Sequence, residues 1–278
     1  MLEKLQKHFR SVIKSLEVLY VMEGAKPSAR VLCHEDNLEA TLKFLEENKI
    51  KAEVSDFKVV KENTVSSFYS DKSVMIDRGS KTKGHLILYA SKDEVLAKSA
   101  KNFEKGQNHK QLGMALGYPE CCCDFFEKNF SEAKTDLTLE SLKNSDGMKF
   151  PFLNNIAARH FDISLLSHFP HSFQCKESEK IADNYLKILE KTNKNIAKSF
   201  ADTLKCGVLY TETDGVFLLR NYKYEQEDFS FGSAVGTKIN RIYRLLASGR
   251  KVKVFGKNSV EINEIKIEGN DIGFMIFG

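Results

Sequence analysis

The chain lacks several features that would assign it to a class at once. It has no tryptophan and four prolines, and no apolar run approaches the roughly 20 residues that a membrane-spanning helix needs. Its opening residues are charged and amphipathic and lack the apolar core of a signal peptide. We therefore expect a cytoplasmic protein that does not enter the membrane. Abundant lysine, asparagine and phenylalanine beside so little tryptophan and proline indicate an AT-rich genome rather than a function.

Internal repeats, low-complexity segments and nucleotide, flavin or glycosidase signatures are also missing from the sequence. With 42% hydrophobic and 29% charged residues, the 278-residue chain has the composition of an ordinary globular protein. Its length predicts two domains, or one domain with an appendage. The net charge of +4 is too small to indicate nucleic-acid binding by itself.

The six cysteines are the first positive signal. In a reducing compartment they stay as thiols, so a disulfide framework is a weaker explanation than a metal site or catalysis. They occur at Cys33, Cys121, Cys122, Cys123, Cys175 and Cys206. A plain alternative is that these thiols fill the core, since free cysteine is among the most buried residue types.

Hydrophobic periodicity predicts a mixed fold, α+β or α/β, in three regions. We expect an α/β N-terminal region over 1–90, a helical region over 91–205 that carries the Cys/His motifs, and a β-rich module over 206–278. The predicted helices cover 2–22, 91–130 with an interruption near Gly117, 154–166, 172–204 and 237–247. The predicted strands include 29–33, 52–59, 85–89, 208–210, 216–219, 251–255, 265–267 and 272–277.

Three adjacent cysteines follow a proline at the start of a predicted helix. They are Cys121, Cys122 and Cys123, which come directly after LGYPE. The first turn of a helix has unpaired N–H groups and partial positive charge, so it favours thiolate over thiol. Neighbouring helical residues point about 100° apart, so one or two of the three thiols can face a single site. The sequence does not indicate which.

A second cluster of ligand-type residues begins another predicted helix. Ser172 is the expected N-cap, which places Cys175 in the first turn, with His168 and His171 just before it. We expect His168, His171 and Cys175 to join Cys121 or Cys122 in one tetrahedral site. This mixed donor set favours zinc or mononuclear iron, with an iron–sulfur cluster as the alternative.

The two motifs together resemble those of an uncharacterised prokaryotic domain-of-unknown-function family that occurs largely in archaea. Its first motif is LGYPxCC, matched here by LGYPECC and the following Phe125 and Phe126. Its second block is similar to HxPCSxxCxxS, matched here by His168, Pro170, Ser172, Cys175 and Ser178. His171 replaces the first cysteine of that block, an exchange between two metal-capable side chains. The resemblance covers roughly residues 85–180 and supports a site there without implying a reaction.

Two further residues are candidates for general acid/base work beside the metal. Glu120 adjoins the cysteines, and His109 lies ten residues before Pro119 on the same helical stretch. Each also has a simpler interpretation. An acidic residue suits any first helical turn, and a lone helical histidine is more often solvated.

A basic cluster in the C-terminal module is a candidate nucleic-acid interface. It includes Lys238, Arg241, Arg244 and Arg250, with no acidic residue between them. The module from residue 206 onward nevertheless has ten basic and nine acidic residues. A solvated basic face is therefore the more economical interpretation.

These patterns leave three functional hypotheses. The favoured one is a metal-dependent enzyme that acts on an anionic substrate at two helix N-termini. The second is a nucleic-acid-associated protein with a structural metal. The third is a thiol enzyme with a cysteine of the 121–123 run as nucleophile and His168 or His171 as base. Substrate, metal identity and oligomeric state do not follow from the sequence.

Overall fold

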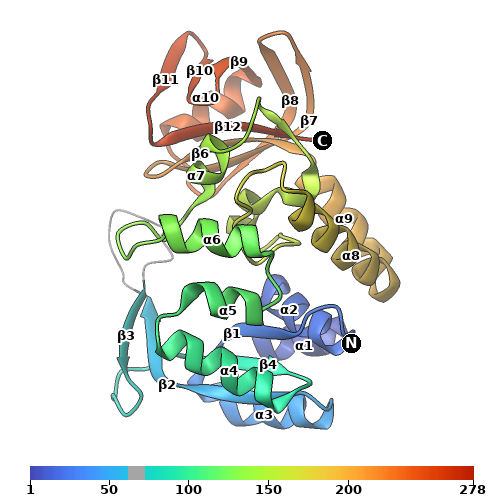
Figure 1. The fold of residues 1–278 in the computed structure, drawn as a ribbon. Helices are drawn as coiled ribbons and strands as arrows, with labels where there is room; N and C mark the ends of the chain where they lie inside the picture. Colours follow the sequence, from blue (N-terminus) through green and yellow to red (C-terminus); the bar gives the residue numbers. More distant parts are fainter. Residues whose placement is uncertain (62–72) are drawn as a thin grey trace. The chain divides into compact units, whose positions relative to one another are not determined.

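A computed structural model describes residues 1–61 and 73–278, which form a mixed α+β fold with a β-rich C-terminal sheet (Figure 1). The predicted fold class is confirmed. The chain folds as two compact units: the first contains the described residues of Met1–Asn63 and Asp71–Thr135 together with Asn184–Lys194, and the second contains Asp136–Asp183 and Asn195–Gly278. The domain boundaries predicted after residues 90 and 205 stay predictions. Each compact unit contains segments that lie far apart in the sequence, whereas the predicted domains are continuous stretches.

The first unit is built on a four-stranded antiparallel sheet in the order β1-β4-β2-β3. Its strands are β1 (Ser28–His34), β2 (Lys51–Lys61), β3 (Ser73–Asp77) and β4 (His85–Ser91). Its helices are α1 (Leu2–Phe9), α2 (Val12–Met22), α3 (Leu38–Glu47), α4 (Glu94–Lys105), α5 (His109–Ala115) and α6 (Glu120–Asn129), with a 3-10 turn η1 (Glu35–Asn37). Ile87 and Tyr89 of the sheet pack against Ala100 of α4 and Leu112 of α5, so these helices cover one face.

Local capping divides two stretches that were predicted as longer helices. The predicted helix over 2–22 is broken because Arg10 adopts a left-handed conformation (φ 50°) and Ser11 caps α2 by accepting from the Lys14 N–H at 3.3 Å. The predicted stretch over 91–130 is three helices. Asp93 caps α4, through a 2.7 Å hydrogen bond from the Val95 N–H.

The second unit contains an eight-stranded sheet in the order β11-β10-β9-β8-β7-β6-β12-β5. All neighbouring strands are antiparallel except β12 and β5. The strands are β5 (Lys149–Phe150), β6 (Cys206–Thr211), β7 (Gly215–Glu225), β8 (Asp228–Gly236), β9 (Lys251–Gly256), β10 (Ser259–Ile262), β11 (Ile265–Glu268) and β12 (Ile272–Phe277). Phe217, Phe229 and Phe274 form its core with Leu246 of α10 (Arg241–Gly249).

The remaining helices lie between α6 and β6 in the sequence, on either side of β5. They are α7 (Thr138–Lys143), the 3-10 helices η2 (Phe152–Asn154) and η3 (Ile156–Phe161), α8 (Lys176–Thr192) and α9 (Lys194–Leu204). The α-helix predicted over 154–166 is therefore wrong, because Asn155 starts a 3-10 turn by accepting from the Ala158 N–H. The helix predicted over 172–204 is interrupted at Asn193. In the described part of the chain, every helix is too short or too polar to cross a lipid bilayer.

Candidate metal centre

The LGYP segment forms a tightly packed turn at the start of α6. Gly117 has a φ of +80°, and a Cβ at this position would lie 2.6 Å from Cδ of Pro27. Only glycine satisfies both conditions without strain or displacement. Pro119 then caps α6, and its carbonyl accepts from the N–H of Cys122 at 2.9 Å. The cysteines therefore begin at the second residue of the helix, within its first turn.

A buried ion pair supports this turn from the side. The Lys26 Nζ lies 2.9 Å from a Glu17 carboxylate oxygen, with side-chain exposures of 0% and 7%. The same ammonium lies 4.6 Å from the ring centroid of Tyr118. Burial alone would lower the pKa of Lys26, but the charge of Glu17, the neighbouring Tyr118 and Tyr185 and the hydrogen bond to Glu17 together outweigh it and raise that pKa. Lys26 therefore stays protonated. Its contact with the Tyr118 ring restricts the conformation of Tyr118, the residue before Pro119.

The three adjacent cysteines separate into a pair and a single residue. The Sγ atoms of Cys121 and Cys122 lie 3.9 Å apart. Cys123 turns toward α5, where a Cβ at Gly113 would lie 2.7 Å from its Sγ. Its thiol donates to the Tyr118 carbonyl at 3.8 Å, and burial raises its pKa to about 11. Cys123 is thus a neutral core thiol, whereas Cys121 and Cys122 share one side of the helix start.

Hydrogen bonds to three residues hold the loop that carries His171. One of these residues lies within α7, and the other two directly follow it. The Ser141 hydroxyl donates to the Pro170 carbonyl at 2.6 Å, and the Asn144 side chain donates to the His171 carbonyl at 3.2 Å. The Ser145 hydroxyl accepts from the Phe173 N–H at 2.8 Å. These contacts fix the backbone on both sides of His171 before any ligand binds.

Cys175 stands at the start of α8, where an N-cap residue is expected. The N–H of Ser178 donates to the Cys175 Sγ at 3.5 Å, and the N–H of Glu179 donates to its carbonyl at 3.0 Å. The Asn154 side-chain amide donates to that carbonyl at 3.1 Å, and Asn154 is fully buried. Ser172 was predicted as the cap, but α8 begins at Lys176. An N–H donor and the helix dipole both favour a thiolate on Cys175.

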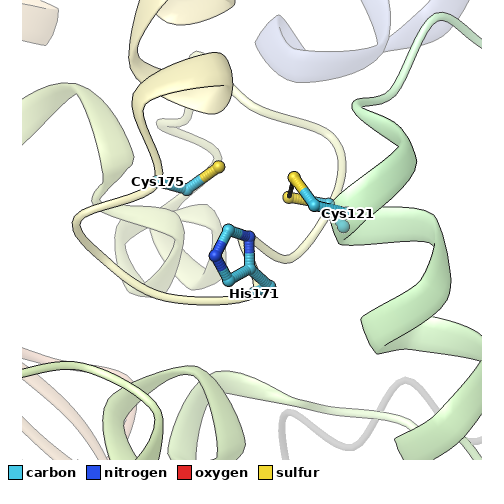
Figure 2. A group of neighbouring side chains, drawn as sticks. Cys121, His171 and Cys175 are labelled. Carbon is cyan, nitrogen blue, oxygen red and sulfur yellow. Dashed lines mark hydrogen bonds between the residues drawn. The ribbon is translucent and has the colours of Figure 1, made fainter.

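Cys121, Cys122, His171 and Cys175 form a group that could hold a metal ion. One ligand atom from each lies within 4.8 Å of the others (Figure 2). A tetrahedral ion with metal–sulfur bonds of about 2.3 Å separates two thiolates by about 3.8 Å. The 3.9 Å between the Sγ atoms of Cys121 and Cys122 agrees with that separation. The donor set of three cysteines and one histidine is typical of zinc and is compatible with iron.

Three predicted site residues lie outside this group. The Nε2 of His168 lies 2.9 Å from the Ser178 hydroxyl, and both side chains are buried. Glu120 is 66% exposed and pairs with Lys110 at 3.3 Å. The ring of His109 packs edge-on against Phe130 with centroids 4.9 Å apart. His168 supports the start of α8 through Ser178, while the acid/base roles of Glu120 and His109 stay predictions.

The sequence did not indicate that Asn154, Ser141, Asn144 and Ser145 hold the 168–175 loop. Asn154 also donates to the Phe173 carbonyl at 3.0 Å, so one amide joins two carbonyls of the loop. Buried asparagines that bind backbone carry no distinctive local pattern. The sequence also predicted a helix that begins at residue 154, whereas Asn154 ends a short 3-10 helix.

A partly buried ionic network lies in the same unit as the 168–175 loop. Oδ2 of Asp136 lies 2.8 Å from a guanidinium nitrogen of Arg159 and 3.2 Å from Nε2 of His160. Burial alone would raise the pKa of Asp136, but the charge of Arg159 and the hydrogen bond from His160 hold it well below its ordinary value. Arg159 also stacks on Phe169, with 4.5 Å from Cζ to the ring centroid. The network therefore anchors one end of the loop.

The basic residues of the C-terminal module occupy different environments. Lys238 donates to the Thr213 carbonyl at 2.6 Å, and Arg250 ends α10 in a left-handed conformation. Arg241 and Arg244 are exposed and line a shallow hollow along α10. Nucleic-acid binding by these residues stays a prediction.

No protein-family model matches the chain, and no curated protein or solved structure matches it either. The metal site is therefore inferred from the residues and distances of this chain. The resemblance of the two Cys/His motifs to a largely archaeal family stays a prediction.

Proposed function

We propose that this protein is a mononuclear metalloprotein that binds one Zn²⁺ or Fe²⁺ ion through Cys121, Cys122, His171 and Cys175. The observation that carries the proposal is the convergence of four ligand atoms within 4.8 Å of one another. Two of the residues come from the first turn of α6, and two come from a segment about 50 residues later. Ordinary core packing has no need to bring three thiols and an imidazole to one point.

A single ion fits this group better than an iron–sulfur cluster. Such clusters are usually held by four cysteines, and here the fourth donor is His171. Cys123, the remaining thiol of the adjacent run, is packed toward Gly113. Zinc accepts mixed sulfur and nitrogen ligands in a tetrahedron, so it requires the least adjustment of the group.

Metal content measured on protein purified without oxygen or chelator tests the proposal. We expect about one zinc or iron per chain and, after exchange into Co²⁺, the intense visible bands of tetrahedral cobalt bound to thiolates. Cys122→Ser and Cys175→Ser should lose the ion. Cys123→Ser and Cys206→Ser are matched controls, since both thiols are buried and lie outside the group.

The proposal fails if the wild-type protein, purified without chelator and supplied with Zn²⁺, Fe²⁺ or Co²⁺, stays metal-free while folded. Loss of metal from the Cys123→Ser control to the same extent as from Cys175→Ser would also contradict it. A brown protein with several irons per chain would replace the single ion by a cluster.

One observation favours a second function, in which the metal is structural. Four protein ligands complete a tetrahedron and match the donor number of closed structural zinc sites. The metal would then stabilise a protein that binds nucleic acid through Arg241 and Arg244, which are exposed on α10. Salt-dependent binding of single-stranded RNA that is lost in Arg241→Glu/Arg244→Glu, with unchanged metal content, would support this alternative.

A further inference from the structure

The four candidate ligands differ in their exposure to solvent. Cys122 and Cys175 are 2% and 3% exposed, and His171 is partly buried. Cys121 is exposed. Cys122 lies in the core, the His171 backbone is held by Asn144, and Cys175 is held by Asn154 and Ser178.

This difference determines which metal–ligand bond is easiest to break. A buried thiolate that leaves a metal carries its charge into an environment without water, which is costly. An exposed thiolate is hydrated as it leaves, so its release lacks that penalty. Ligand exchange in this group is therefore favoured at Cys121 over Cys122 or Cys175.

We propose that Cys121 is an exchangeable ligand and that a small thiol substrate from solution replaces it on the metal. This inference rests on the proposed metal site. Cys122, His171 and Cys175 keep the ion, which then has three protein ligands and one open position, as in catalytic zinc sites. The sequence-based hypothesis of an enzyme that binds an anionic substrate is compatible with this open position.

The exchange is balanced in charge, protons and electrons. The bond between the metal and the Cys121 Sγ breaks, and its electron pair stays on sulfur. The incoming thiol transfers its proton to that sulfur and binds the metal as a thiolate, so no oxidant or reductant is needed. A thiol is the expected class of substrate because its thiolate has the charge and softness of the ligand that it replaces. The N-terminal end of α6 favours negative charge at this position.

The test uses cobalt-loaded protein and compares truncation of each cysteine. We expect Cys121→Ala to retain one cobalt per chain after gel filtration, whereas Cys122→Ala and Cys175→Ala elute without cobalt. In Cys121→Ala, addition of 2-mercaptoethanol should strengthen the sulfur-to-cobalt charge-transfer band as the thiol fills the open position. Cys123→Ala is the control for loss of a neighbouring thiol and should resemble the wild type.

A second measurement needs no variant. Wild-type cobalt protein treated with iodoacetamide should be alkylated at Cys121 while it keeps cobalt, with Cys122 and Cys175 protected in the mapped peptides. Protection of all three thiols to the same extent would overturn the proposal, as would a folded Cys121→Ala protein without cobalt. A wild-type protein that binds no cobalt would instead overturn the metal site itself, so the two failures are distinguishable.

Discussion

Replacement of Lys26 by methionine should cost the first unit much of its stability. The Lys26 side chain is fully buried, its Nζ is 2.9 Å from the Glu17 carboxylate, and it contacts the Tyr118 ring. Lys26→Met keeps the length of the side chain but leaves Glu17 as a buried charge without its cation. Removal of one partner from a buried ion pair costs about 3–5 kcal/mol.

The size of this loss can be converted into a urea midpoint. With an m-value of about 3 kcal/mol per molar urea for a chain of this size, the midpoint should fall by roughly 1–2 M. Glu17→Leu/Lys26→Met should recover most of the loss, because a buried ion pair is often replaced by apolar side chains without net cost. Lys98→Met is the control: Lys98 pairs with Glu94 on the exposed face of α4, so its midpoint should stay near that of the wild type.

Urea unfolding followed by far-UV circular dichroism on the four proteins decides the matter. A Lys26→Met midpoint as close to wild type as that of Lys98→Met would refute the reasoning. So would a double variant no more stable than the single one, because the loss would then come from the missing lysine stem rather than from an uncompensated charge. If the ion pair also orients the α6 start through Tyr118, both Lys26→Met and the double variant should bind Co²⁺ more weakly than the wild type does.

Three further predictions concern the turn, the ionic network and the metal. Gly117→Ala should lower the thermal midpoint more than Gly147→Ala does, because both glycines have a positive φ but only at Gly117 would the added Cβ also clash. Asp136→Asn should destabilise the protein most at neutral pH. The pKa of Asp136 in the folded protein is depressed. The charge of Asp136 therefore stabilises the fold above the ordinary aspartate pKa of about 4, and this stabilisation declines as the pH falls below that value. The difference in urea midpoint between Asp136→Asn and the wild type should shrink between pH 5 and pH 3. Chelation with EDTA should lower the thermal midpoint of the wild type but not of Cys175→Ser, since a metal that binds only the folded state adds to stability by mass action.

Strong local signals made much of the fold predictable. The strands over 29–33, 85–89 and 272–277 are largely apolar runs, and the structure contains them as β1, β4 and β12. The helix breaks were harder to foresee. Arg10 and Gln107 end helices in left-handed conformations that the sequence marks only weakly, since neither is glycine or asparagine. Strand β8 was missed because Gly232 and Gly236 interrupt its pattern and suggest a loop instead.

The sequence identified the residue types of the site. It did not show which of the neighbouring cysteines and histidines contribute ligand atoms. Cys122 and Cys123 are equivalent in any local pattern. They differ because Gly113 on α5 leaves room for the Cys123 sulfur, which is a tertiary contact between two helices. His168 and His171 lie seven and four residues before Cys175, and the sequence predicts both of them as ligands. Ser178 binds His168 and leaves His171 with the cysteines.

The second motif therefore combines two physical roles in one short segment. His168 and Ser178 bind each other across the start of α8, and the Ser178 N–H reaches the Cys175 sulfur. His171 and Cys175 supply the candidate ligand atoms. The two roles place different demands on a side chain: the contact between His168 and Ser178 depends on shape, whereas a ligand position needs only a side chain that binds metal, which either histidine or cysteine provides.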